Sequence, residues 1–251
     1  MKSIIKNRHV NLKYAILMLA LLLTQSFTLK AQDTNAKPAV LPAVGTSAIL
    51  GTIDGIAIED KVQSPSNEPA QLQIVCVFEY SEGDIFTSPP ALPAAANGMV
   101  HVDKQLNGLI TDLRKSGKFA GHALETLLII PPKGTIAAKM LLVIGLGNRK
   151  DFTPDLMTDV GRTGMREALR LGVTSYAHAS DLKDGGIDSP TALVANNVLK
   201  GAIEAYETDL YLQTKQAAAH KTLTKITLLA GQAFFKPSGD AIKKFIADYQ
   251  K

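Results

Sequence analysis

The chain has 251 residues, with 27 lysines and arginines against 23 aspartates and glutamates. Residues 1–31 hold five of the basic residues and none of the acidic ones, so the rest of the chain has a net charge of −1. The remainder is therefore not basic and shows no basic stripe that would follow a phosphate backbone, so we expect no nucleic-acid partner. The single cysteine, Cys76, excludes an internal disulfide, and its apolar neighbours predict a buried, inert thiol.

The N-terminus has the pattern of a secretory signal peptide. Four basic residues within positions 2–13 precede an apolar core at residues 14–23, and Ala31 offers a small residue for cleavage. The alternative is a membrane anchor, but this core is short for about 30 Å of hydrocarbon. We predict a signal peptide over residues 1–31, export to the periplasm or the cell exterior, and no membrane attachment after cleavage. Residues 32–44, rich in Ala and Pro, predict a flexible linker.

Strand signals open the folded part of the chain. β-Branched residues over 49–58, interrupted by Gly51 and Gly55, predict one edge strand. Residues 72–79 are apolar on both faces, which is typical of a central strand. A proline-rich loop is expected over residues 87–98.

A helix and two strands follow. Leu106, Leu109, Ile110 and Leu113 recur at helical spacing and predict one helix over residues 103–115. The two strands are expected at residues 126–130 and 139–145.

The second half of the chain alternates helices and strands. Thr153-Pro154-Asp155 predicts the start of a helix that runs to about residue 171 and stops at Gly172. Gly161 and Gly164 lie inside this helix, and each costs about 1 kcal/mol relative to alanine, so we expect the helix to approach the sheet closely there. The further elements expected are a strand at 173–179, a helix from 189 to about 206, a strand at 225–231 and a short amphipathic helix at 240–249. The alternation predicts an α/β fold, a three-layer α/β/α sandwich with a mixed, largely parallel sheet.

One glycine loop is the candidate ligand site. Gly145 and Gly147 end an apolar strand, followed by Asn148, and backbone N–H groups of such a loop can hold an anion. The dinucleotide fingerprint is incomplete, because Lys150 stands where the third glycine belongs. The alternative is that the glycines serve only a sharp turn.

Other chemistry has little support in the sequence. The histidines lack the spacing of a zinc site, and His178 is more simply a structural histidine than a ligand. Asp181, Asp184 and Asp188 lack the register of a calcium loop and are expected to be solvated, with Asp188 capping the next helix. No nucleophile motif occurs. We therefore predict no catalytic residue, no metal site and no cofactor.

Three segments, residues 106–129, 137–169 and 201–211, together resemble the N-terminal domain of the leucyl (cytosol) aminopeptidase family. Phe119-Ala120-Gly121 matches a turn of that domain, and Gly145-Leu146-Gly147 with the basic Arg149-Lys150 matches its glycine loop. Tyr206 and Asp209 fit a later turn. The resemblance implies that residues 45–251 form such a domain, ending in a short helix, with a fold similar to the macro domain, which is known for binding ADP-ribose.

The family's two-metal site and catalytic residues lie in a C-terminal domain around an Asn-Thr-Asp-Ala-Glu-Gly-Arg motif, which these 251 residues do not contain. The expected function is therefore an exported, non-catalytic module for protein interaction or regulation, with a protein partner or a second copy docking on a terminal helix that carries Ile242, Phe245, Ile246 and Tyr249. That helix could instead fold back on its own sheet. An alternative is a domain that binds a small anionic ligand, such as a nucleotide or ADP-ribose, near Gly145, Gly147 and Asn148. A third hypothesis is one part of an aminopeptidase that assembles with a separate catalytic subunit.

Overall fold

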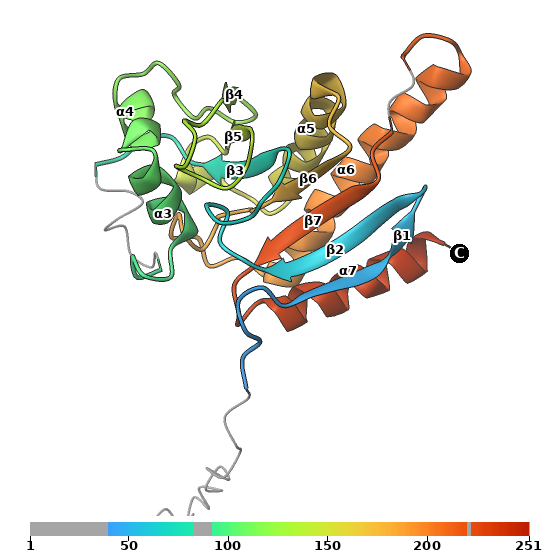
Figure 1. Cartoon of the computed structure of the whole chain (residues 1–251), viewed down its shortest axis with the longest axis horizontal. Helices are drawn as coiled ribbons and strands as arrows, with labels where there is room; N and C mark the ends of the chain where they lie inside the picture. The colour runs from blue at the N-terminus through green and yellow to red at the C-terminus, as the bar shows by residue number, and fades with distance from the viewer. Residues whose placement is uncertain (1–39, 83–91, 220–221, 251) are drawn as a thin grey trace, which may run out of the picture. The chain divides into compact units, whose positions relative to one another are not determined.

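The computed structural model describes residues 40–82, 92–219 and 222–250. Their strands form one sheet in the order β1-β2-β7-β6-β3-β5-β4 (Figure 1). The inner strands are parallel to one another, while β1 and β4 run antiparallel at the two edges. The strands are β1 (Ser47–Ile53), β2 (Ile56–Val62), β3 (Gln73–Val77), β4 (Thr126–Ile129), β5 (Leu141–Gly145), β6 (Ser175–His178) and β7 (Lys225–Ala230). The predicted mixed, largely parallel sheet is confirmed.

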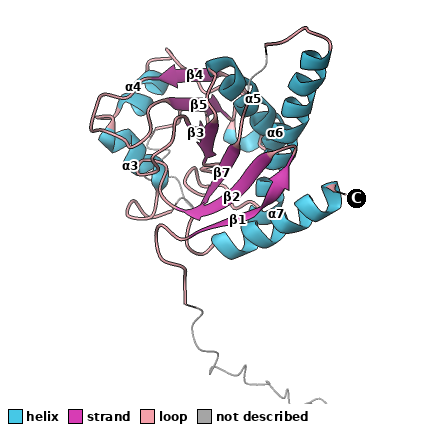
Figure 2. Ribbon diagram, turned by 45° about the vertical axis from the view of Figure 1, so that its right-hand side comes forward, coloured by secondary structure: helices cyan, strands magenta, loops and turns pink. Residues whose placement is uncertain are grey.

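Helices cover both faces of this sheet (Figure 2). In β3, Ile74 and Cys76 belong to the larger core cluster, together with residues of α5, α6 and α7. Val75 and Val77 point the other way, into a smaller cluster with α3 and α4. Alternate residues of one buried strand thus fill two cores, as a three-layer α/β/α sandwich requires. The helices are α3 (Gly98–Gln105), α4 (Leu109–Lys115), α5 (Leu156–Leu171), α6 (Thr191–Thr214) and α7 (Phe235–Tyr249), with a short 3₁₀ turn η1 (Arg149–Asp151).

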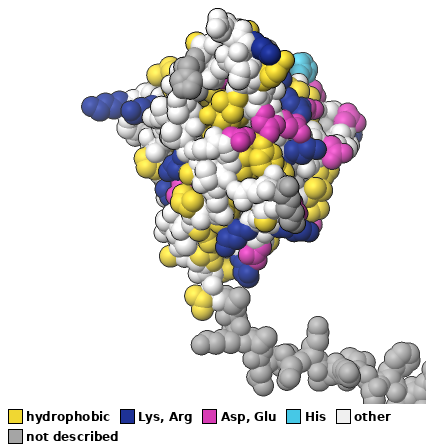
Figure 3. Space-filling model, turned by 90° about the vertical axis from the view of Figure 1, so that its right-hand side faces the viewer, with side chains coloured by type: hydrophobic (Ala, Val, Ile, Leu, Met, Phe, Trp, Pro, Cys, Tyr) yellow, Lys and Arg dark blue, Asp and Glu magenta, His cyan; other side chains and the backbone are white. Residues whose placement is uncertain are grey.

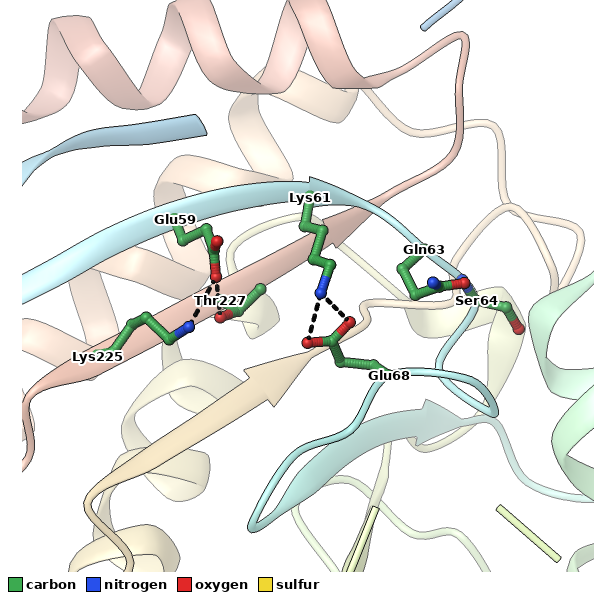
Figure 4. Close-up of polar contacts among 7 residues, drawn as sticks. All are labelled: Glu59, Lys61, Gln63, Ser64, Glu68, Lys225 and Thr227. Atoms are coloured by element: carbon green, nitrogen blue, oxygen red, sulfur yellow. Dashed lines mark hydrogen bonds and ion pairs between the residues drawn. The ribbon is translucent and has the colours of Figure 1, made fainter. Parts of the chain in front are cut away.

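The layer of α3 and α4 covers the sheet around β3 and β5, whereas β2 and β7 carry polar side chains on that face (Figure 4). Glu59 accepts hydrogen bonds from Lys225 Nζ at 3.0 Å and from Thr227 Oγ1 at 2.8 Å. Partial burial acts to raise the pKa of Glu59, but the bonds from Thr227 and Lys225 outweigh it and lower the pKa. Lys61 pairs in the same way with Glu68, at 2.8 Å. On β2 and β7, these polar side chains of the sheet face are therefore paired with one another rather than covered by α3 and α4.

The first hairpin corrects the prediction of a single strand over residues 49–58. Two strands, β1 and β2, occupy this region and are joined by Asp54 and Gly55, whose φ angles are 47° and 82°. Two successive residues with positive φ are the signature of a tight hairpin turn, and Asp-Gly is a favoured pair for it. The Asp54-Gly55 pair is visible in the sequence, and its preference for a turn breaks the β-branched run into two strands.

The single helix predicted over residues 103–115 is also wrong, because the chain forms α3 and α4 there. Asn107 and Gly108, with φ of 56° and 81°, break the helix between them. Asp103 stabilises the break, since its carboxylate accepts the N–H groups of Ile110 and Thr111. The apolar residues do lie at helical spacing, but they belong to two helices, and the buried Asp103 carboxylate accepts N–H groups at the start of the second one.

Three helix ends differ from the prediction as well. The helix expected from residue 153 begins at Leu156, and no side chain caps it. α6 continues to Thr214, and α7 begins at Phe235, five residues before the expected 240. Gly172 does end α5 in the left-handed conformation, with φ of 70°, as predicted.

The glycines of α5 allow two different close approaches. A Cβ on Gly164 would lie 2.9 Å from Ile74 Cδ1, so α5 does approach the sheet closely at this residue. A Cβ on Gly161 would instead overlap the carbonyl oxygen of Val198 in α6, and one on Gly201 would overlap that of Thr158 in α5. The cost of the glycines is thus offset by packing against the neighbouring helix as well as the sheet.

The predicted leader, residues 1–31, lies outside the described residues, as does most of the predicted linker. Within the described ranges, no helix combines the length and apolar character needed to cross a bilayer. On the face drawn in Figure 3, acidic and basic side chains are interspersed among hydrophobic ones.

Candidate functional site

A cavity of about 680 Å³ opens where β2, β6 and β7 end. Its lining is mostly apolar, with Val62, Ala179 and Ala230 from the strand ends and Val194 and Val198 from α6. Open α/β sheets bind ligands at the carboxyl ends of their parallel strands, where helices and loops leave a crevice. The position, size and lining of this strand-end cavity are those of a small-molecule site.

Three neighbouring strands place a row of side chains along the inner wall of the strand-end cavity. Leu228 of β7 is the register partner of Asp60 in β2 and of His178 in β6. All three residues line the cavity. Two buried polar side chains therefore flank one leucine on the same face of the sheet.

Asp60 is fully buried on an otherwise apolar strand face. Its Oδ2 accepts a hydrogen bond of 2.9 Å from the Ser238 hydroxyl of α7. Its Oδ1 has no hydrogen-bond partner among the described residues. Burial raises the pKa of Asp60 to about 6, although the Ser238 bond opposes this. One oxygen of the buried carboxyl group is thus bonded and the other is not.

His178 is the second polar side chain of the row, and it is 2% exposed. Its Nε2 lies 3.9 Å from the Cys76 sulfur, while its Nδ1 has no partner within the described ranges. Burial lowers the pKa of His178 to about 4, so the imidazole is neutral. The thiol of Cys76 is buried, as the sequence predicted, and burial raises its pKa.

Two further carboxyl groups, Asp181 and Asp184, lie on the loop after β6 and also line the cavity. The prediction that they are solvated is wrong. Asp181 Oδ2 accepts the N–H of Cys76 at 3.0 Å, and Asp184 Oδ2 accepts the N–H of Met99 at the start of α3 at 3.1 Å. Burial raises the pKa of Asp184 to about 6 and that of Asp181 well above its ordinary value.

Asp188 is the exposed member of the predicted trio, but it does not cap α6, whose N-cap is Pro190. Its carboxylate instead pairs with Lys183 at 2.6 Å. Lys183, which lines the cavity, also donates to the Ser189 carbonyl oxygen. The ammonium group of Lys183 is therefore already engaged by protein oxygens.

The glycine loop predicted to bind a ligand lies at the end of β5, and none of its residues lines the strand-end cavity. The N–H of Gly145 donates to Glu125, and that of Gly147 donates to Gly121. The side chain of Asn148 accepts the N–H of Lys150. Gly147 has a φ of 73°, which a turn requires. The ligand-binding role of Gly145, Gly147 and Asn148 stays a prediction.

Sequence reasoning missed Asp60, although a signal for it exists. In β2, Ile56, Ile58 and Val62 occupy every second position except that of Asp60, which interrupts the apolar series where a residue must face the core. An acid at such a position marks a functional or strained site. The signal becomes readable only when the strand is known to begin at Ile56 rather than at residue 49.

Within the parts of the chain that the structure describes, no three His, Cys, Asp or Glu side chains are grouped so that they could hold a metal ion. The polar groups of the cavity are spread over separate strands and loops. What the arrangement offers is hydrogen-bond acceptors in an apolar surrounding.

Comparison with known proteins places the chain in a family. The model of the cytosol aminopeptidase family, N-terminal domain, matches residues 74–216. A probable cytosol aminopeptidase of Alkaliphilus oremlandii is 33% identical over 114 residues, which is 45% of this chain and 22% of that protein. One from Thermosynechococcus vestitus is 30% identical over 124 residues, 47% of this chain and 22% of that protein. The chain thus matches about a fifth of the length of these relatives.

Solved structures with the same fold are macrodomains. A macrodomain of Oceanobacillus iheyensis with MES bound has a TM-score of 0.53 and 16% identity, over 81% of this chain and 98% of that one. The same macrodomain with ADP has a TM-score of 0.51 and 14% identity, over 81% and 98%. The predicted resemblance to the leucyl aminopeptidase N-terminal domain, with a macro-domain-like fold, is confirmed. The chain belongs to the cytosol aminopeptidase family, through its N-terminal domain.

Proposed function

We propose that this domain binds a small organic molecule in the strand-end cavity. The single observation that carries the proposal is the cavity itself, about 680 Å³ of mostly apolar space at the carboxyl ends of β2, β7 and β6. Sites of this kind bury most of a small ligand and orient it with a few polar groups. Asp181 and Lys183, on the loop after β6, are partly exposed polar residues of the cavity lining.

A ligand screen with a cavity-filling variant tests the proposal. Nucleosides, ADP-ribose, amines and short peptides are added to the purified protein, and the unfolding temperature is recorded. A ligand present at a hundred times its Kd stabilises the folded state by about 2.7 kcal/mol. Ala195→Phe, which fills the cavity from α6, should abolish the shift.

Leu193→Phe is the matched control for this variant. Leu193 lies on the same helix, is 44% exposed and does not line the cavity, so this change should leave binding intact. A screen in which no compound shifts the unfolding temperature contradicts the proposal. So does a ligand whose shift is the same in Ala195→Phe as in the unaltered chain.

Nucleotides are one class within this proposal, because a structural neighbour is a macrodomain with ADP. Three carboxyl residues, Asp60, Asp181 and Asp184, line the cavity, and its lysine, Lys183, already pairs with Asp188, so the lining offers little to hold a phosphate. The loop at Gly145, Gly147 and Asn148 is the alternative place for an anion. Amide chemical shifts during an ADP-ribose titration would distinguish the two, because residues 145–148 and residues 178–184 belong to different loops.

The protein-interaction role was motivated by the apolar face of the terminal helix, and that face is largely covered within the chain. Ile242 and Ile246 of α7 are buried, and Phe245 packs against the same core. Tyr249 is 38% exposed and bonds Asp54 at the β1–β2 turn. The apolar face of α7 therefore folds back on its own sheet. Light scattering of the purified chain tests the interaction role, and a strict monomer without a co-purifying partner would argue against it.

We also propose that the chain is exported and does not hydrolyse peptides by itself. The basic and apolar pattern of residues 1–31 supports export, and N-terminal sequencing of the protein from cell fractions tests it. The family match to an N-terminal domain supports the lack of hydrolysis. Release of product from a leucine anilide by the pure chain with added zinc or manganese would contradict the second proposal.

A further inference from the structure

β1 forms one edge of the sheet, with α7 beside it (Figure 1). In an edge strand, every second residue directs its N–H and C=O groups away from the sheet, where no neighbour meets them. Natural proteins usually protect such an edge by keeping the strand short, or with charges, prolines or bulges. The two edges of this sheet differ in that protection.

The β4 edge is the better protected of the two. β4 has four residues, Thr126–Ile129, and Pro131 and Pro132 follow after Ile130. A proline cannot donate to a β ladder, so these two residues limit pairing beyond the strand. β1 has seven residues, Ser47–Ile53, and contains neither a proline nor a charge. β1 is therefore the edge that can accept another strand.

The outward-facing groups of β1 belong to Ser47 and Ile49. The carbonyl oxygen of Thr46 accepts the N–H of Val62 at 2.8 Å, so Thr46 faces β2. The direction of the main-chain groups alternates along an antiparallel strand, so Ala48 also faces β2, while Ser47 and Ile49 face outward. In the described part of the chain, no strand lies beyond them. Their N–H and C=O groups are thus open to a further strand.

The second half of β1 is less suited to such pairing. The ladder with β2 is irregular between Ile49 and Gly51, where Leu50 is the extra residue. A bulge bends the strand and interrupts regular pairing. Beyond it, the carbonyl oxygen of Thr52 accepts a hydrogen bond of 3.1 Å from Gln250 Nε2. The open stretch is therefore the part of β1 before the bulge, residues 47–49.

The side chains of the open stretch are uncharged. Ser47 and Ile49 are both exposed, and Ile49 is 58% exposed although it is a large apolar residue. Behind Ile49 on β2 lies its register partner Glu59, whose charge is paired with Lys225. Two copies of this stretch would therefore meet without like-charge repulsion, and both would bury part of Ile49.

One antiparallel register of two β1 strands pairs both outward residues. With a two-fold axis at Ala48, Ser47 of each copy lies opposite Ile49 of the other. These residues then form two hydrogen-bonded pairs, with about four main-chain hydrogen bonds between the copies. Ala48 faces its own counterpart at the narrow position between those pairs, where the Cα atoms are about 4.5 Å apart and a small side chain fits. The stretch is self-complementary, as a two-fold interface requires.

We propose that two copies of this chain associate through their β1 strands, antiparallel about a two-fold axis at Ala48, and so join their sheets into one. The paired stretch is short, so the association is weak and depends on protein concentration. Residues 47–49 do not line the strand-end cavity, so this interface is independent of the proposed ligand site.

Sedimentation analysis of the purified chain, from micromolar to millimolar concentration, tests the association. The unaltered chain should show an equilibrium between monomer and dimer. Ile49→Lys places a charge on the open stretch and should raise the dissociation constant at least tenfold. Ile130→Lys is the matched control, because Ile130 is 68% exposed directly after β4. This variant should dimerise as the unaltered chain does.

Cysteine crosslinking tests the register. In Ala48→Cys the two thiols would face each other at a Cα distance that a disulfide can span, so mild oxidation should give a covalent dimer. Thr52→Cys is the control on the same strand, because its two copies would lie about 27 Å apart along the paired strands. The natural cysteine, Cys76, is buried and does not compete. This test keeps the proposal open to refutation if Ile49→Lys does not fold.

Several outcomes would overturn the proposal. One is a chain that stays monomeric at every concentration. Another is a dimer that Ile49→Lys leaves unchanged, because the copies would then meet elsewhere. Equal crosslinking of Ala48→Cys and Thr52→Cys would contradict the register, and a different protein found bound at β1 in place of a second copy would contradict the choice of partner. None of these results bears on ligand binding in the cavity.

Discussion

Two groups of strand ends, both along the carboxyl edge of the parallel strands, have opposite characters. At the end of β5, the N–H groups of Gly145 and Gly147 are bonded within the fold, and a Cβ on Gly145 would overlap the carbonyl oxygen of His122. At the ends of β2, β7 and β6, a cavity remains; Asp60 and His178 are among its lining residues, and one buried atom of each has no hydrogen-bond partner among the described residues. The glycines at the end of β5 therefore mark tight packing, whereas Asp60, a single acid within β2, lies beside the cavity.

The largest effect is expected from filling the packed end. In Gly145→Ala the added methyl group would meet backbone atoms, with the Gly121 carbonyl oxygen within 2.7 Å, so the chain itself must move. We expect a loss of more than about 3 kcal/mol in the free energy of unfolding. Urea denaturation measures it.

Gly231→Ala is the matched change at the open end. Its Cβ would lie 3.3 Å from a ring carbon of Phe234, a side chain that can turn away. The cost should be about 1 kcal/mol or less. Similar losses in Gly145→Ala and Gly231→Ala would mean that the two ends do not differ in packing.

A smaller effect concerns the pH dependence of stability. The pKa of Asp60 is about 6 in the folded chain against an ordinary 3.8, so the folded state holds more protons between these values. The stability that Asp60 contributes is fully present below pH 3.8 and is lost as the pH rises through 6. Asp60→Asn removes this dependence, so the stability of the variant relative to the unaltered chain should rise by about 1 kcal/mol from pH 5 to pH 8.

Thermal or urea unfolding of both chains at the two pH values checks this difference. Asp184, with a similar pKa, and His178, whose lowered pKa acts in the opposite direction, are present in both chains and cancel. A difference that does not change with pH would show that Asp60 has an ordinary pKa.

The smallest effect is expected on the outward face of β2 and β7. Lys225 is 41% exposed where it pairs with Glu59, so Lys225→Gln should cost less than about 1 kcal/mol. The pKa of Glu59 should rise, because the bond and the charge of Lys225 are lost and only the Thr227 and Ser47 hydroxyl groups remain to oppose burial. The variant should bind any cavity ligand as the unaltered chain does. A loss of binding would extend the site to this face.

Much of the fold was readable because it depends on local patterns. The apolar runs at β3 and β5, the Gly172 stop and the alternation of helices and strands all predicted elements that the structure contains. The errors lie where a turn competes with a longer periodic pattern, at Asp54-Gly55 and Asn107-Gly108. In both cases residues with positive φ end one element and begin the next. The pattern of apolar residues continues across the turn, so it does not reveal the boundary.

The site was less readable, because it joins residues that are far apart in the sequence. Asp60 and His178 come from β2 and β6, which the strand order places on either side of β7, and the packing of α7 adds Ser238. Their residue types gave no motif. Burial gives Asp60 and His178 their altered pKa values, and burial is a property of the folded chain.

The amino-acid sequence by itself determined the α/β class, the sheet-forming segments and the family resemblance, since periodicity and short motifs are local properties of the chain. The tertiary structure decided which strand end is packed and which is open. That outcome depends on how α6 and α7 lie over β2, β7 and β6, and β2 precedes both helices by more than a hundred residues.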